Sequence, residues 1–133
     1  MTVVDSSVVV AALVDNGRDG QWAADLLAAP TVIAPHLLPV EVAQILRRLV
    51  HSRLLSADVA TLALDDLTDL AIPLHEFGPY AGRVWELRET VTAYDAWYVA
   101  LAEAFDVPLA TLDRRLAKAP GPRCEFRVPA AAG

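Results

Sequence analysis

Four acidic residues stand at positions from which they could act together. Asp5 ends a short apolar segment that reads as a strand, and Asp113 ends a second one. In a parallel sheet both ends lie on the same edge, the edge where open α/β folds place their sites. Asp95 begins a buried helix that leads into the strand ending at Asp113, and Glu41 borders the apolar face of the predicted helix 37–52. We therefore expect the four side chains to converge.

Each of these acids also has a purely structural interpretation. Asp5 and Asp113 have the residue type and position of helix N-caps. Thr92 and Asp95 have the spacing of a capping box, and Glu41 lies in a first helical turn, where a carboxylate interacts favourably with the helix dipole. Taken singly, each acid is better explained by its structural role. A structural role does not explain why all four would meet.

Converging carboxylates repel one another and raise each other's pKa unless a cation is present. Oxygen ligands without Cys or His favour Mg²⁺ or Mn²⁺. A pair of such ions would activate water and stabilise the leaving oxygen in phosphodiester cleavage. Bound cations would also reverse the local field, which allows an acidic protein to accept an anionic substrate.

The composition limits the class of protein. The chain has 133 residues, of which 55% are hydrophobic and 21% charged, so we expect one globular domain over residues 1–133. Its 17 acidic and 11 basic residues give a net charge of −6 and a pI near 4.9. Proteins that bind phosphate backbones by charge alone are usually basic. A nucleic-acid substrate would therefore require a counter-charge at the site.

Several features predict a cytoplasmic protein without a membrane span. The longest stretch without a formal charge, residues 26–40, is shorter than the ~18–20 residues that a span needs. The first residues, MTVVDSS, lack a basic region and meet an acid at once, which is not the pattern of a signal peptide. The single cysteine, Cys124, cannot form an internal disulfide or a cysteine-based zinc site. A lone thiol without an export signal fits a reducing compartment.

Strands and helices are expected to alternate along the chain, which predicts a three-layer α/β/α sandwich with a mainly parallel central sheet. The run VVVAALV after Ser7 fits either a strand or a helix, and the preceding Asp-Ser-Ser favours a helix. The expected strands are 2–5, 31–34, 72–75, 107–113 and an edge strand at 125–128; the expected helices follow Ser6 and cover 21–29, 37–52, 56–70, 80–89, 92–105 and 114–119.

Other kinds of active site find little support. The chain contains no GxGxxG, GxxxxGK[ST], GxSxG or HExxH motif. His36, His51 and His75 are scattered without partners at metal-ligand spacing. Ser6 and Ser7 have no nearby base, so helix capping explains them better than nucleophilic attack.

Four segments resemble the successive motifs of PIN-domain proteins, and most closely those of the VapC-type ribonuclease toxins of bacterial toxin–antitoxin pairs. The segments are VDSSVVVAALV, PHLLPVEVAQILRR, TAYDAWYVALAE and LATLDRRLA, in the family's order and spacing over essentially the whole chain. TAYDAWYVALAE followed closely by TLDRRL is quite specific, whereas VDSS alone would be weak.

The resemblance assigns roles to individual residues. The acidic quartet of the family falls on Asp5, Glu41, Asp95 and Asp113, which would hold Mg²⁺ or Mn²⁺ and hydrolyse a phosphodiester of RNA. The resemblance favours transfer RNA as the substrate, with ribosomal or messenger RNA as the alternatives. Ser7 and Thr111 match small hydroxyl residues that support the site, and Arg88 matches a basic residue ahead of the YDA motif. Gln44 departs from the family, which often has Asn there.

The resemblance also implies partners. Proteins of this type are cytoplasmic homodimers inhibited by a small VapB-type antitoxin, whose arginine-bearing tail lies near the acidic pocket. Exposed apolar residues of helices 37–52 and 56–70 could supply the partner surface, although core packing explains most of them. Trp22, Trp85, Trp97 and Tyr80 could stack on unpaired bases, and the arginines at 47, 48, 114 and 115 could contact phosphates. Core packing, above all for Trp97, and solvated helix faces are the simpler interpretations.

Two further functions compete with a ribonuclease. A PIN-like domain without catalysis would act as a binding module, although all four acids are present. A phospho-acceptor receiver domain also gathers acids at the carboxyl edge of a parallel sheet, but here Lys118 falls in a predicted helix and no aspartate ends a central strand at mid-chain.

Overall fold

The computed structural model describes residues 1–29 and 31–131. The strands are β1 (Thr2–Val4), β2 (Val32–Pro35), β3 (Leu74–His75), β4 (Leu109–Ala110) and β5 (Phe126–Arg127). The helices are α1 (Ser6–Val14), α2 (Arg18–Leu27), α3 (Leu38–His51), α4 (Ala57–Asp69), the 3₁₀ turn η1 (Gly78–Tyr80), α5 (Ala81–Glu86), α6 (Ala93–Phe105) and α7 (Arg114–Ala117). None of the helices described is both long and apolar enough to cross a membrane.

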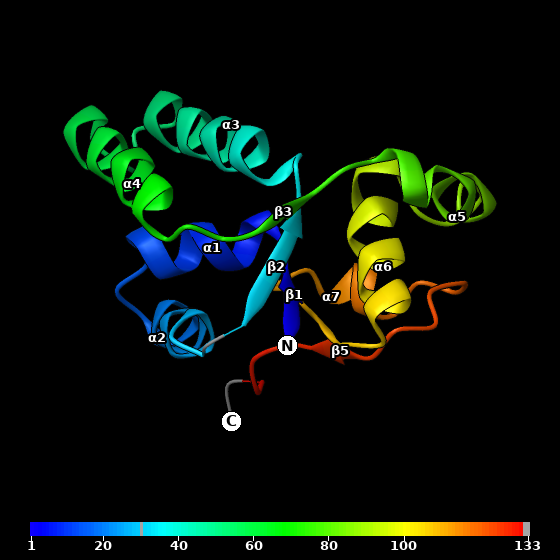
Figure 1. Cartoon of the computed structure of the whole chain (residues 1–133). Coiled ribbons are helices and arrows are strands. Elements are labelled where there is room, and N and C mark those ends of the chain that lie inside the picture. Colours follow the sequence, from blue (N-terminus) through cyan, green and yellow to red (C-terminus); the bar gives the residue numbers. More distant parts are fainter. Residues whose placement is uncertain (30, 132–133) are drawn as a thin grey trace.

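The five strands form one parallel sheet in the order β3-β2-β1-β4-β5. Helices α1 to α4 lie on one side of the sheet and α5 to α7 on the other (Figure 1). The predicted three-layer α/β/α sandwich is therefore confirmed, with a sheet in which every pairing is parallel. The carboxyl ends of β1 and β4, its central pair, open onto one edge of the sheet.

The ambiguous apolar run after Ser7 is helical. Asp5 caps α1 by accepting a hydrogen bond from the backbone N–H of Val8, which provides the start signal that outweighs the strand preference of consecutive valines. The residues from Val8 to Ala11 are all buried, because α1 packs against the sheet as well as against α2, α3 and α4. Tertiary burial on several faces thus replaces the one-sided pattern of a surface helix.

Several predicted boundaries were wrong. The strand expected at 107–113 is only β4, because its last residues turn toward α7, and the strand expected at 72–75 is only β3. The helix expected at 80–89 is the turn η1 followed by the short α5. Helix α2 begins at Arg18 rather than at 21, since Gly17 has an extended N-cap conformation and Asp19 supplies a first-turn carboxylate.

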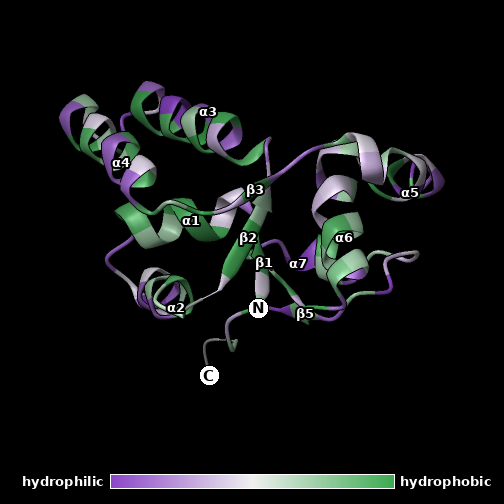
Figure 2. Cartoon of the chain, viewed as in Figure 1, coloured by the Kyte–Doolittle hydropathy of each residue, from purple (hydrophilic) through white to green (hydrophobic). Residues whose placement is uncertain are grey.

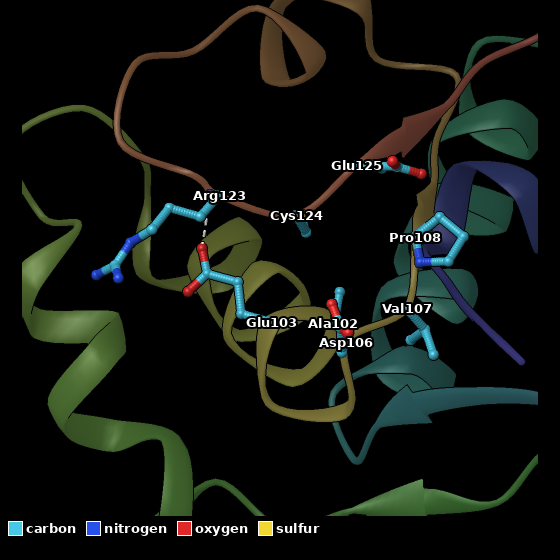
Figure 3. Close-up of a pocket in the computed structure, with 8 residues that line it drawn as sticks. All are labelled: Ala102, Glu103, Asp106, Val107, Pro108, Arg123, Cys124 and Glu125. Atoms are coloured by element: carbon cyan, nitrogen blue, oxygen red, sulfur yellow. Dashed lines mark hydrogen bonds between the residues drawn. The ribbon is translucent and has the colours of Figure 1, made fainter.

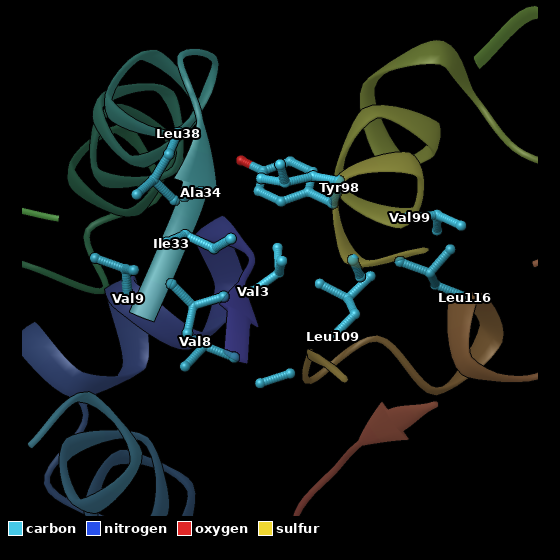
Figure 4. Packing of buried hydrophobic residues seen from close by; sticks show 14 of the residues in the cluster. Val3, Val8, Val9, Ile33, Ala34, Leu38, Tyr98, Val99, Leu109 and Leu116 are labelled. Carbon is cyan, nitrogen blue, oxygen red and sulfur yellow. The ribbon is translucent and has the colours of Figure 1, made fainter. Parts of the chain in front are cut away.

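The core lies on both faces of β1. Val3 and Val4 are fully buried, and in Figure 4 the side chain of Val3 lies among those of Val8, Ile33, Leu109 and Tyr98. Tyr98 and Leu101 close this core from α6. In Figure 2 the hydrophobic colour covers the central strands and α1, whereas α3 and α4 are banded. Full burial of a Val or Leu side chain contributes about 1.5–3 kcal/mol, so the apolar centre holds the sheet edge in place.

Gly20 lies at the close approach of α2 to the end of α1, and a side chain there has no room. A Cβ atom would fall 1.8 Å from the carbonyl oxygen of Asp15 and 3.0 Å from that of Ala11. We expect Gly20→Ala to lower the free energy of unfolding by more than about 2 kcal/mol, as measured by urea denaturation, because backbone atoms must move. Gly82→Ala is the matched control: no atom lies within 4 Å of its Cβ, and alanine raises helix propensity by up to about 1 kcal/mol. Equal stability of the two variants would contradict this packing.

Candidate active site at the carboxyl edge of the sheet

Asp5 emerges from β1 beside the end of β4. Its carboxylate is buried and accepts hydrogen bonds from the Ser7 hydroxyl (2.5 Å) and the Val8 backbone N–H (3.2 Å) on Oδ1, and from the Thr111 hydroxyl on Oδ2. These donors come from the first turn of α1 and from the end of β4, and they fix the carboxylate in one orientation. Asp5 is thus both the cap of α1 and an acid facing this edge.

The hydroxyls that hold Asp5 also hold the turn after β4. Ser7 Oγ accepts a hydrogen bond from the Leu112 N–H (3.1 Å), and Thr111 Oγ1 accepts one from the Asp113 N–H (3.0 Å). Each hydroxyl therefore links Asp5 to the segment that carries Asp113. Ser7 and Thr111 thus orient Asp5, and their supporting role in catalysis stays a prediction.

Asp113 and Asp95 are placed by helix starts. Asp113 caps α7, with its Oδ1 accepting from the Arg115 N–H (2.9 Å) and the Leu116 N–H (3.3 Å). Asp95 sits in the first turn of α6, and its N–H donates to Thr92 Oγ1 (3.2 Å), the predicted capping interaction. The structural interpretation of these acids is correct, and it also defines where their carboxylates lie.

Glu41 reaches the same region from the opposite layer. It lies in the first turn of α3, and its Oε1 accepts a hydrogen bond of 2.6 Å from the hydroxyl of Tyr98 on α6. Tyr98 is only 1% exposed, so this hydrogen bond links α3 and α6 inside the protein. Sequence reasoning missed Tyr98. The available signal was its position three residues after Asp95, which places both side chains on one side of α6.

Asp95 lies within range of the charges of the other three carboxylates. The pKa of Asp95 is raised by burial and then by the charges of Glu41 and Asp113. The pKa of Asp5 is raised to about 6, mainly by burial and further by the charge of Asp95, although the bonds from its donors oppose the rise. Burial and the bond to Glu41 raise the pKa of Tyr98, so it remains a hydroxyl donor. This is the electrostatic signature of an acidic site.

The donor chemistry suits a hard cation, although the carboxylates do not yet form a coordination shell. All four contribute oxygen, and the bonds to Glu41 and Asp113 fall on one oxygen of each, so the second can face a cation. Within residues 1–29 and 31–131, no group of three or more acidic, histidine or cysteine side chains is arranged so that it could hold a metal ion. Binding a cation would therefore require these side chains to move closer together.

A hollow of about 340 Å³ borders the carboxylates on the α6 side. Asp95 and Asp113 lie in its wall together with Thr92 and Arg115. Arg115 contributes a basic side chain to the same wall, and a guanidinium there can bind a phosphate oxygen. The hollow is thus suited to the charged groups of a phosphodiester rather than to an apolar ligand.

Arg88 lies apart from this arrangement. Its guanidinium is exposed, donates to the Trp85 carbonyl (2.9 Å), lies 3.7 Å from Glu89 and stacks over the Trp85 ring at 4.7 Å. A supporting role for Arg88 stays a prediction, since these contacts all lie within its own segment. Gln44 is exposed on α3.

A second cavity, of about 500 Å³, lies at the other edge of the sheet, where β4 and β5 begin (Figure 3). Glu103 in its wall is bonded to Arg83 (2.7 Å) and to the Arg123 N–H (2.7 Å). Burial raises the pKa of Glu103, but these bonds outweigh it and the net shift is downward. Burial raises the pKa of the Cys124 thiol to about 11. Such paired or protonated groups hold structure together and offer no activated acid, base or nucleophile.

Comparison with known proteins agrees with the fold. A family model, PIN domain, matches residues 2–122. Among solved structures, PAE2754 from Pyrobaculum aerophilum has a TM-score of 0.70 at 21% identity and covers 94% of this chain and 81% of its own. VapBC-5 from Mycobacterium tuberculosis, a member of the VapBC family of toxin-antitoxin systems, has a TM-score of 0.58 at 22% identity over 96% of this chain and 95% of its own. The chain belongs to the PIN-domain family.

Curated relatives narrow this assignment. Ribonuclease VapC1 of Mycobacterium tuberculosis is 46% identical over 127 residues, covering 95% of this chain and 96% of the relative. VapC ribonuclease Mb0985 of Mycobacterium bovis is 39% identical over 128 residues, covering 96% and 98%. Within the PIN-domain family the chain therefore groups with the VapC ribonucleases, which confirms the resemblance identified from its motifs.

The raised pKa of Asp5 predicts a pH-dependent stability. Between about pH 4 and pH 6 the folded chain retains a proton that the unfolded chain releases, so this group's stabilisation is complete below pH 4 and is lost as the pH rises through 6. The loss amounts to about 3 kcal/mol at 1.36 kcal/mol per pKa unit. We expect the difference in unfolding free energy between wild type and Asp5→Asn to change by that amount across this window, in chelator-treated protein. A constant difference would contradict the burial of a carboxylate here.

The bond between Tyr98 and Glu41 makes a separate prediction. Tyr98→Phe leaves a half-buried carboxylate without its donor and should lower the free energy of unfolding by about 1–2 kcal/mol, as measured by urea denaturation. Tyr94→Phe, four residues earlier and 63% exposed, is the matched control and should leave stability unchanged. The same loss in both variants would show that the Tyr98 hydroxyl does not brace α3 against α6.

Proposed function

We propose that this chain is an endoribonuclease that depends on Mg²⁺ or Mn²⁺, held by Asp5, Glu41, Asp95 and Asp113. The observation that carries the proposal is that four carboxylates lie at the starts of α1, α3, α6 and α7, where the hydroxyls of Thr111 and Tyr98 connect their segments. The rise that Glu41 and Asp113 cause in the pKa of Asp95 agrees with this placement. Helix capping accounts for Asp5 and Asp113, but not for Glu41, which caps no helix and reaches Tyr98 of α6 from α3. The membership in the VapC ribonucleases supports the same chemistry.

A divalent cation bound at these oxygens would supply an activated water and charge stabilisation for phosphodiester hydrolysis. The protein's own contribution is orientation. Ser7 and Thr111 hold Asp5, Tyr98 holds Glu41, and the backbone of α7 holds Asp113. Arg115 in the wall of the hollow would bind a phosphate oxygen of the substrate.

We propose transfer RNA as the substrate class. The site is a hollow at the rim of the sheet, which can receive an unpaired, exposed segment but not the interior of a duplex. Sequence-specific RNA recognition usually targets single-stranded loops, whose bases are accessible. Transfer RNA presents such loops on a stable scaffold, and the resemblance of the motifs to VapC-type toxins favours it over ribosomal or messenger RNA.

The proposed regulatory partner is a VapB-type antitoxin encoded beside this chain in a cytoplasmic toxin–antitoxin pair. An apolar groove of about 460 Å³ between α1 and α3 reaches the site at Ser7 and Leu112. An amphipathic segment lying in this groove would bring an arginine to the carboxylates, where charge-assisted hydrogen bonds would hold it. An antitoxin segment bound in this groove would therefore inhibit the chain by direct contact with the acids.

A homodimer is part of the same proposal. As expected, most apolar residues of α3, such as Val42 and Leu46, belong to the core. Others stay exposed around α3 and α4, including Val40 (67%), Leu54 (76%) and Leu62 (63%). These side chains offer surface for a second copy of the chain.

The experiment that tests the function is a map of new RNA 5′ ends after brief expression in bacteria. Wild type should produce a discrete new end in a transfer RNA. Asp95→Asn should reduce that signal at least about a hundredfold, because several kcal/mol of transition-state stabilisation depend on the cation. Asp95→Asn should also be folded and at least as stable without metal, since it removes a repelled charge. Asp58→Asn, in the exposed first turn of α4, is the matched control.

Equal cleavage by wild type and Asp95→Asn would overturn the proposed mechanism. If neither protein cleaves RNA, calorimetric titration with Mn²⁺ separates the remaining alternatives. A wild type that binds no Mn²⁺ would favour a catalytically silent binding module. A discrete end in ribosomal or messenger RNA would keep the mechanism and correct the substrate.

A further inference from the structure

A separate cleft, of about 360 Å³, lies near the proposed active site. Its wall is formed by Arg18, Asp19 and Trp22 from the start of α2, Arg114 from α7, and residues 129–130 of the C-terminal segment. Strand β5 is parallel to β4, so the residues that follow β5 leave the sheet at the same edge as Asp113. The cleft and the carboxylates therefore share one edge of the molecule.

Helix α7 connects the cleft to the hollow that contains the carboxylates. Arg114 directly follows Asp113, so their Cα atoms lie only about 3.8 Å apart. The Arg114 guanidinium donates a hydrogen bond of 2.7 Å to the Pro129 carbonyl and is thereby fixed in the wall of the cleft. The next residue, Arg115, lines the hollow that contains Asp95 and Asp113. Two successive arginines thus face two neighbouring cavities.

The groups in the cleft are those that bind a nucleotide. Trp22 is half-buried and packs against the core, so its indole is a rigid apolar surface in the wall. Aromatic side chains of this kind stack on unpaired bases without regard to sequence. Arg18 and Arg114 supply two guanidinium groups for phosphate oxygens, while Asp19 lies in the first turn of α2, where it interacts with the helix dipole.

We propose that this cleft is a substrate-positioning subsite for a nucleotide of single-stranded RNA that flanks the cleaved bond. The inference rests on the proposed ribonuclease function. Trp22 stacks on the base, and Arg18 and Arg114 bind the adjoining phosphate, so the strand passes over α7 between the cleft and the carboxylates. In a chain with a net charge of −6, this pair of arginines gives an anionic strand a favourable position beside the acidic site.

An RNA strand suits the cleft better than a protein partner does. A peptide that brings arginine to the carboxylates would be repelled by Arg18 and Arg114. The apolar groove between α1 and α3 already offers such a peptide a surface of the right character. The two surfaces border the acids at different places and have different chemistry.

The test is fluorescence anisotropy with short 5′-fluorescein-labelled oligouridylate and oligoadenylate and Mg²⁺, in the Asp95→Asn chain to prevent cleavage. Trp22→Leu should weaken binding of both oligonucleotides about fivefold or more, the lower end of aromatic stacking. Arg18→Gln should reduce the slope of log Kd against log salt concentration by about 0.7, the value for one phosphate contact on a single strand. Because Arg18 is exposed, its variant tests the cleft even if Trp22→Leu does not fold.

Two controls carry comparable substitutions elsewhere. Phe105→Leu removes an aromatic ring that is 40% exposed at the end of α6, and Arg123→Gln removes an arginine at the amino-terminal edge of the sheet. Both should leave affinity and salt slope unchanged. Equal losses in the controls and the cleft variants would overturn the subsite, because the effect would then be general charge or hydrophobicity.

The remaining outcomes separate this subsite from the function on which it rests. RNA affinity unchanged by both cleft variants overturns the subsite and leaves the ribonuclease standing. If the same variants weaken binding of the purified antitoxin instead, the cleft belongs to the protein partner. Absence of RNA binding overturns the subsite alone when the mapping experiment still shows a discrete cleavage, and overturns both proposals when it shows none.

Discussion

The buried carboxylate of Asp5 is the constraint on which the site depends. An ionisable group at the centre of the sheet edge is costly to desolvate, and it is tolerated because three donors are directed at it from α1 and from the end of β4. Two of these donors, the hydroxyls of Ser7 and Thr111, also accept hydrogen bonds from the backbone of the turn that carries Asp113. Local helix capping, sheet pairing and the position of the second acid are thereby coupled through one side chain.

Helix starts perform a second task in this fold. Three of the four acids cap a helix or lie in a capping box, and the fourth lies in the first turn of α3. Helices that follow parallel strands begin at the carboxyl edge of the sheet, and α6 begins there because it must run back to the start of β4. Capping preferences therefore concentrate carboxylates at one edge. The structural and the chemical interpretations of these acids are consequently complementary.

Much of this arrangement was predictable from the sequence, for physical reasons that differ between elements. The central strands and α6 have long apolar runs, and the parallel pairing of β1 and β4 then fixes the shared edge. The short lengths of β3 and β4 and the split of the segment 78–86 were not predictable, because two-residue ladders leave no periodic signal. Tyr98 was missed for another reason. A tyrosine in an apolar helix looks like core, and only the approach of Glu41 from α3 gives its hydroxyl a partner.

Negative and positive side chains lie next to each other at the start of α7. An acidic chain cannot attract RNA by its net charge, so attraction must be local. The basic side chains nearest the acids in sequence are Arg114 and Arg115, which start the short helix that Asp113 caps. Burial and the charges of Glu41 and Asp113 raise the pKa of Asp95, and a bound cation would oppose that rise. In the proposed ribonuclease, the cation and the substrate would therefore depend on different parts of one turn. The carboxylates would select the cation, and the arginines of α7 would select the phosphate.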